Sequence, residues 1–99
     1  MAEGLQAYAE EDITVAASAI GLSSSNLFSS PPPDQVELFV TLAQLRFRTD
    51  GTDPTAGVGE ILNPFDRYTL TDRNDMLNFR AIRVGGTSAN LRARYRRQH

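Results

Sequence analysis

Two aspartates and three glycines lie close together in the segment RFRTDGTDPTAGVGE, residues 46–60. An EF-hand calcium loop beginning at Asp50 would need a glutamate at its twelfth position, where Ile61 stands. A phosphate loop would need GxxxxGK(S/T), and the chain contains no lysine. Asp50-Gly51 and Asp53-Pro54 are instead strong turn dipeptides. We therefore predict a structural loop, formed by Asp50, Gly51, Asp53 and Pro54, and we expect no metal and no other cofactor.

Serines and a histidine are the other residues that could do chemistry. Ser23, Ser24 and Ser25 lie in a segment rich in serine and proline, and His99, the single histidine, is the last residue. Nucleophilic catalysis needs a base held in a fixed position beside the nucleophile, and nothing in the sequence fixes His99. We therefore expect no catalytic residues and a protein that is not an enzyme.

Arginine is concentrated at the C-terminal end of the chain. Residues 1–44 carry six acids and no base, whereas residues 45–99 carry ten arginines and six acids, which gives the net charge of −2. In the segment 90–97, alternation places Arg92, Arg94 and Arg96 on one face of a strand, and Arg80, Arg83 and Arg97 extend this basic patch. Single-strand nucleic-acid binders place stacking aromatics among such arginines, but Tyr95 falls on the opposite face. An acidic protein surface, including the chain's own acidic first half, is therefore favoured over nucleic acid as the partner.

Length and composition limit the possible architectures. The 99 residues fit one small domain, and the absence of cysteine excludes disulfides and thiolate metal sites. No run of 18 apolar residues exists, and the first residues are acidic where a signal peptide is basic. We therefore expect neither a membrane span nor a secretory signal.

Alternating hydrophobicity is the main secondary-structure signal. Val36, Leu38, Val40 and Leu42 alternate with other side chains, and the pattern continues to Arg48 either through a bulge near Ala43 or as a second strand. Further strands are predicted over residues 13–22, 68–70, 77–84 and 90–97, with a short apolar piece near 58–62. The first twelve residues are expected to form a turn or two of helix or an extended arm, residues 23–34 a proline-rich linker, and Gly85-Gly86 a hairpin turn.

These elements predict an all-β fold. Six or seven short strands separated by turn signals, with no helical period, indicate a small antiparallel β-sandwich, jelly-roll-like, with an extended N-terminal arm. We predict that residues 1–34 hold the arm, the first strand and the linker, and that residues 35–99 form the main part of a single β-sandwich domain.

Three segments together resemble a group of small virion proteins of tailed bacteriophages and prophages: LRFRTDGTDPTAGVGEIL, YTLT and FRAIRVGGTSANLRARY. The family pattern has a strand, R-(F/Y)-R-x-D-G-T-x-P-T, G-x-x-L, a strand, F-R-A-I-R-x-G and L-x-V-x-Y, in that order. The resemblance covers about residues 12–96. The chain departs from the pattern in its SSSNLFSSPPPD linker and in Arg92 and Arg94. The match is carried by Arg46 to Arg48, Asp50, Gly51, Thr52, Pro54, Thr55, Phe79 to Arg83, Leu91 and Tyr95.

The resemblance implies a non-enzymatic structural protein of the virion, made in the host cytoplasm. We expect a capsid decoration (cement) protein that self-associates, with a trimer favoured, and clamps neighbouring major capsid subunits. The alternatives are a head–tail connector, a fibre or tail attachment adaptor, and, as a weaker option, a receptor- or glycan-binding module. In this hypothesis the acids Glu3, Glu10, Glu11 and Asp12 pair with arginines of a neighbour. The candidate contact residues are Leu5, Tyr8, Glu10, Glu11, Leu27, Phe28, Arg92, Arg94 and Arg96.

Overall fold

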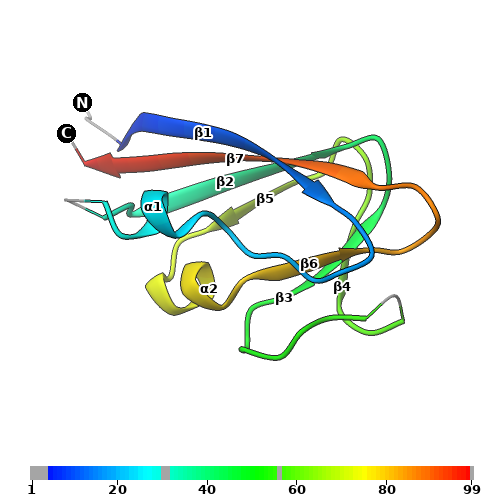
Figure 1. Ribbon diagram of the computed structural model, residues 1–99. Coiled ribbons are helices and arrows are strands. Elements are labelled where there is room, and N and C mark those ends of the chain that lie inside the picture. Colours follow the sequence, from blue (N-terminus) through cyan, green and yellow to red (C-terminus); the bar gives the residue numbers. More distant parts are fainter. Residues whose placement is uncertain (1–4, 30–31, 56, 99) are drawn as a thin grey trace.

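The structure is a computed structural model that describes residues 5–29, 32–55 and 57–98. Within these ranges the chain forms seven strands and two short helices (Figure 1). The strands are β1 (Leu5–Val15), β2 (Gln35–Thr41), β3 (Leu45–Arg48), β4 (Glu60–Leu62), β5 (Arg67–Leu70), β6 (Arg80–Arg83) and β7 (Ala89–Gln98). The helices are α1 (Ser24–Leu27) and α2 (Arg73–Asn78).

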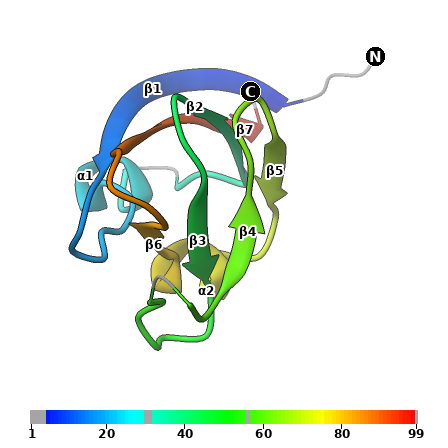
Figure 2. The ribbon, with the colours of Figure 1, turned by 90° about the vertical axis from the view of Figure 1, so that its right-hand side faces the viewer.

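The strands form two antiparallel sheets that pack face to face. One sheet has the order β1-β7-β2-β5 and the other the order β4-β3-β6. Figure 2 shows the first sheet arching over the second. The prediction of an all-β fold is confirmed, and the jelly-roll topology stays a prediction.

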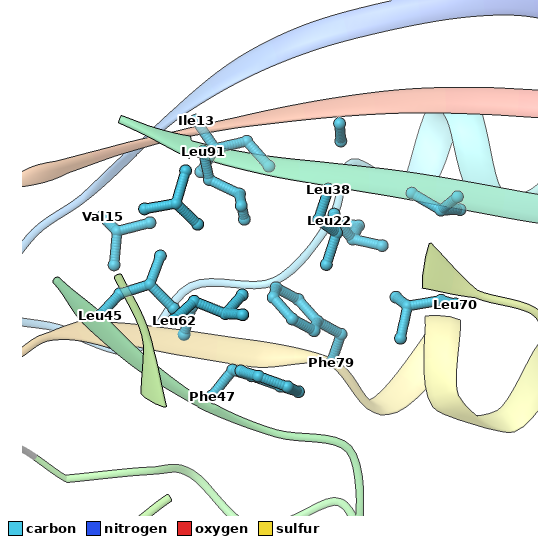
Figure 3. Packing of buried hydrophobic residues seen from close by; sticks show 14 of the residues in the cluster. Ile13, Val15, Leu22, Leu38, Leu45, Phe47, Leu62, Leu70, Phe79 and Leu91 are labelled. Atoms are coloured by element: carbon cyan, nitrogen blue, oxygen red, sulfur yellow. The ribbon is translucent and has the colours of Figure 1, made fainter. Parts of the chain in front are cut away.

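A single hydrophobic core fills the space between the sheets (Figure 3). Alternation in β2 turns Val36, Leu38 and Val40 inward, and all three are fully buried. In β7 the inward residues include Leu91 and Tyr95, as the sequence predicts. The opposite sheet contributes a second layer, and the labelled core residues of Figure 3 are Ile13, Val15, Leu22, Leu38, Leu45, Phe47, Leu62, Leu70, Phe79 and Leu91.

The N-terminal segment is part of the four-stranded sheet, whereas the sequence predicts a turn or two of helix or an extended arm in the first twelve residues. Residues 5–15 form β1, which pairs with β7 along its whole length, from Leu5 opposite Gln98 to Val15 opposite Ala89. The predicted first strand, 13–22, therefore lies mostly outside β1. Alternating hydrophobicity did not indicate this strand because its inward positions include Ala9 and Glu11, and neither residue is strongly apolar.

Two connections carry the chain from one sheet to the other, and only the second differs from the predictions. The chain breaks at Leu42, so β2 and β3 are separate strands in different sheets, which is the second of the two predicted arrangements. Gly85-Gly86 does not close a hairpin, because β6 and β7 also lie in different sheets. Both turns carry the chain from one layer of the sandwich to the other.

The sequence also missed both helices. α1 lies inside the predicted proline-rich linker and buries Leu27. α2 replaces the beginning of the strand predicted over 77–84, buries Met76, and is capped by Asp72, whose carboxylate accepts a hydrogen bond from the Asn74 amide at 2.8 Å. In the described part of the chain, no helix is both long and apolar enough to cross a membrane.

The two long sides of the sandwich are closed differently. Beyond β1, the chain crosses to the other sheet, where Ala16 accepts a hydrogen bond from the Arg83 amide at 3.0 Å and Ile20 exchanges two backbone hydrogen bonds with Ala81. We call this the closed side. On the other side the edge strands β5 and β4 face each other without a connecting strand in the described residues, and we call this the open side.

Candidate interaction surfaces

The outer face of the four-stranded sheet carries a ladder of ion pairs. Register places Asp12 opposite Arg92 and Glu10 opposite Arg94. The Nε of Arg92 donates to Asp12 at 3.2 Å, and the Nε of Arg94 donates to Glu10 at 2.6 Å. On the β2 side, Arg96 donates to Glu37 at 3.1 Å.

These contacts place the acid–arginine pairing within one chain. The hydrogen bond from Arg92, assisted by Asn90, lowers the pKa of Asp12 below its ordinary value of 3.8, and the same pair raises the pKa of Arg92. Glu10 and Asp12 therefore have partners within the chain, and their predicted pairing with a neighbour's arginines stays a prediction. Glu3, predicted to pair in the same way, lies outside the described residues. Arg92, Arg94 and Arg96 pair with acids of the chain's own first half.

None of the three arginines predicted to extend the basic patch lies on the outer face of the four-stranded sheet. Arg80 lies in β6 of the other sheet, where its guanidinium donates to the Phe79 carbonyl at 2.7 Å, and Arg83 lies in the same strand. The guanidinium of Arg97 lies 4.0 Å from the centre of the Tyr8 ring, and Arg97 alternates to the face opposite Arg96. The outer face is therefore a mixed charge surface and not a basic one.

Glu11 and Tyr95 form a polar contact on the closed side. The fully buried Tyr95 donates a short hydrogen bond from its hydroxyl to the Glu11 carboxylate, which also accepts from the Ser23 amide at 3.1 Å. Burial, together with the Glu11 carboxylate, raises the pKa of Tyr95. The predicted contact residue Glu11 therefore binds its own chain.

Four more predicted contact residues lie in β1 or at α1. Tyr8 donates to the Asn26 carbonyl at 3.1 Å and packs against Tyr95, with 6.4 Å between ring centres. Leu27 is buried in the core, so its prediction as an interface residue is wrong. Phe28 is exposed, with the guanidinium of Arg73 5.1 Å from its ring centre. The backbone of Leu5 lies in β1, and its side chain is outside the described residues.

Two turns at the other end of the sandwich expose apolar side chains. Leu42 and Phe65 each have 75% of their surface exposed, and each has a left-handed backbone, with φ of 76° and 74°. Their turns are neighbours in both ribbon views (Figures 1 and 2), joined by a 2.8 Å hydrogen bond from Gln44 to Asn63. The ring of Phe65 lies 6.3 Å from that of Phe39 on the outer face. We call Leu42, Phe65 and Phe39 the apolar end.

The predicted structural loop is braced by its own polar groups. Arg48 donates through two nitrogens to Asp50, whose carboxylate also accepts from the Thr52 amide at 3.1 Å, and Gly51 has a φ of +88°. The Arg48 guanidinium is the main cause of the lowered pKa of Asp50. Residues 49–52 form bends, which agrees with the Asp50-Gly51 turn, whereas the structure assigns no turn at Asp53-Pro54, where Pro54 is buried and Asp53 is exposed.

Gly59 ends this loop and fixes its path. Its φ is +134°, and a Cβ at this position would meet the Phe47 carbonyl at 3.1 Å. Its own carbonyl accepts a hydrogen bond from Arg46 at 2.7 Å. Only glycine combines this conformation with so close an approach to β3.

A cleft opens between this loop and the open side of the sandwich. Its volume is about 490 Å³, and its aromatic wall is Tyr68 of β5, whose ring centre lies 4.9 Å from that of Phe47. The lining residues are Phe47, Arg48, Thr49, Asp50, Val58, Gly59, Glu60 and Tyr68. Among residues 5–29, 32–55 and 57–98, no three His, Asp or Glu side chains gather to hold a metal ion.

The sequence reading missed the apolar end and the cleft. Phe65 stands inside the turn motif NPFD, where an aromatic residue is unusual, and this was an available signal. No local sequence pattern could have predicted the cleft, because its lining residues include members of β3, β4 and β5, which are separate in the sequence. Comparison of the chain with protein-family models, curated proteins and solved structures found no match.

Proposed function

We propose that this chain is a non-enzymatic structural protein of a tailed-bacteriophage particle, most simply a capsid decoration protein that self-associates and clamps neighbouring capsid subunits. The motifs in residues 46–55 and 79–83 support the proposal through their resemblance to small virion proteins. A compact β-sandwich whose charged face is internally neutralised suits a building block repeated over a protein shell. In this proposal the apolar end docks on the capsid.

The observation that carries the proposal is the combination of strain and exposure at Leu42 and Phe65. A left-handed backbone costs a residue with a side chain about 1–2 kcal/mol, and glycine avoids that cost. Water disfavours an exposed apolar side chain as well. Both positions carry large apolar residues in spite of these costs. Backbone outliers of this kind gather at functional contacts, and a protein surface is the partner that would bury these side chains.

The test measures binding of the purified chain to particles assembled without it, by co-sedimentation. The variants Leu42→Gly and Phe65→Gly should lose binding by about tenfold or more, because each removes an apolar anchor at the contact. Their free energy of unfolding should be unchanged or about 1 kcal/mol higher, because glycine relieves the left-handed strain. A variant that is as stable as the parent and fails to bind has lost a contact, not its fold.

Phe28→Ala is the matched control, because Phe28 is also an exposed aromatic residue but lies beside α1 at the other end (Figure 1). It should bind as the parent does. If Phe28→Ala abolished binding and the two glycine variants did not, docking would occur through the surface beside α1, and the proposed apolar contact would be wrong.

Copy number separates decoration from the alternative, a head–tail connector or fibre adaptor. Quantitative mass spectrometry of purified particles should find the chain on the order of hundreds of copies, near parity with the major capsid protein. A count of about five to eighteen would place it at a vertex, collar or fibre. Light scattering of the isolated chain would test the trimer.

A further inference from the structure

The cleft of the open side is a concave part of the surface of the described residues. It lies where the inner face of β5 ends, because Tyr68 pairs with the buried Leu38 and so points toward the opposite sheet. Glu60 pairs with Phe47 and therefore projects from the same side of its sheet. Two sheet edges and the braced loop thus form three walls around about 490 Å³, within the range of small-molecule sites.

Several polar groups in the cleft have donors or acceptors that no described residue uses. In the described part of the chain, the Glu60 carboxylate and the Tyr68 hydroxyl make no hydrogen bond. The bidentate pair with Asp50 engages Nε and Nη2 of Arg48, which leaves Nη1 free to donate. The cleft therefore presents an acceptor, a donor and a hydroxyl around one space.

An apolar wall completes the cleft. Tyr68 is 39% exposed and Val58 is 50% exposed, so the ring and the aliphatic side chain are both accessible. Phe47 packs against Tyr68 from behind, which holds the ring in place. A ring held at a strand position has little conformational entropy to lose when a ligand packs on it.

The ligand that fits these groups carries hydroxyls around a partly apolar ring. Each hydroxyl both donates and accepts, so it can bind Glu60 and Arg48, while the C–H face of the ring packs on the aromatic face of Tyr68. We propose that the cleft binds a neutral saccharide, with one pyranose unit seated between Tyr68 and Glu60. The inference is independent of the proposed virion role, because its test uses the isolated chain.

The charges select against anionic ligands. Glu60 and Asp50 together outnumber Arg48 by one negative charge, which opposes acidic sugars and phosphates. The same excess charge would attract a cationic side chain, so the experiment below includes such a side chain as the competing ligand. A neutral polyhydroxylated ring carries no charge that the acidic groups would repel.

The experiment records amide chemical shifts of the full chain while methyl glucoside, methyl galactoside or methyl mannoside is added. At least one of them should give saturable shifts at Thr49, Val58, Gly59 and Glu60. The expected dissociation constant is in the millimolar range, about 1–20 mM, as befits one sugar ring. Methyl glucuronide should bind at least about fivefold more weakly than the corresponding glucoside, because of the acidic walls.

Two variants with a matched control locate the site. Glu60→Gln should weaken binding about fivefold or more, and Tyr68→Ala should abolish saturation. Asp53→Asn removes an exposed acid from the same loop outside the cleft and should leave binding unchanged. Each variant is first required to keep the dispersed spectrum of the parent.

Two outcomes would overturn the proposal. One is the absence of saturable shifts with all three neutral glycosides up to about 50 mM. The other is saturation of the cleft by N-acetyl-arginine amide with no response to the glycosides, which would assign the cleft to a cationic side chain of a protein partner.

Discussion

The closed and open sides of the sandwich each contain a tyrosine and a glutamate, and the two pairs are used differently. On the closed side, the Tyr95 hydroxyl donates to Glu11, which the Ser23 amide also contacts. On the open side, Tyr68 and Glu60 line a cleft, and among the described residues neither polar group has a protein partner. The same residue types therefore stabilise the fold in one place and remain available to a ligand in the other. Changes on the closed side should alter stability, and changes on the open side should alter binding.

Removing β1 is the most severe change to the closed side. A chain that begins at Ala16 lacks the buried Ile13 and Val15 and leaves one edge of β7 without its partner. We expect it to lose its cooperative unfolding transition and its dispersed amide spectrum, since burial of each such side chain contributes about 1.5–3 kcal/mol. Adding a peptide of residues 5–15 should restore part of the dispersion. A shortened chain that still unfolded cooperatively would return β1 to the role of a free arm.

Removing one hydroxyl from each side compares the two pairs directly. Tyr95→Phe should lower the free energy of unfolding by about 1.5–3 kcal/mol, because the charged carboxylate of Glu11 loses the hydrogen bond that the Tyr95 hydroxyl donates to it. Tyr68→Phe should change it by less than about 0.5 kcal/mol. Urea denaturation measures both. Equal changes in the free energy of unfolding would mean that the two tyrosine hydroxyls contribute equally to stability.

Alkaline pH provides a second test of the tyrosine on the closed side, Tyr95. The pKa of Tyr95 is raised above its ordinary value of 10.0, so its contribution to stability is complete below that value and is lost as the pH rises above it. Above about pH 10, each further pH unit should lower the free energy of unfolding of the parent by up to about 1.4 kcal/mol more than it lowers that of Tyr95→Phe. Tyrosinate absorbance reports the ionisation of the tyrosines, and urea denaturation at each pH reports the free energy of unfolding. A parent protein whose free energy of unfolding depends on alkaline pH no more steeply than that of Tyr95→Phe would contradict the assignment.

The sequence predicted the faces of β2 and β7 because period-two alternation is a local signal that follows the backbone pleat. It did not predict β1, because the residue that makes Glu11 acceptable on an inner face, Tyr95, lies 84 positions away. The cap at Asp72 was a local signal for α2 that was overlooked. The left-handed conformation of Leu42 could not be predicted, since it depends on how β2 and β3 are placed in different sheets.

The ion-pair ladder should give the smallest effect, although it is the most conspicuous charge pattern in the sequence. Glu10 and Arg94 are both partly exposed, so water screens their attraction. A double-mutant cycle with Glu10→Gln and Arg94→Gln should give a coupling of about 0–1 kcal/mol that decreases further at about 1 M salt. Urea denaturation of the four proteins at low and high salt measures it. A coupling that exceeded the effect of Tyr95→Phe and persisted in salt would mean that β1 is held to β7 mainly by its outer charges and not by its buried face.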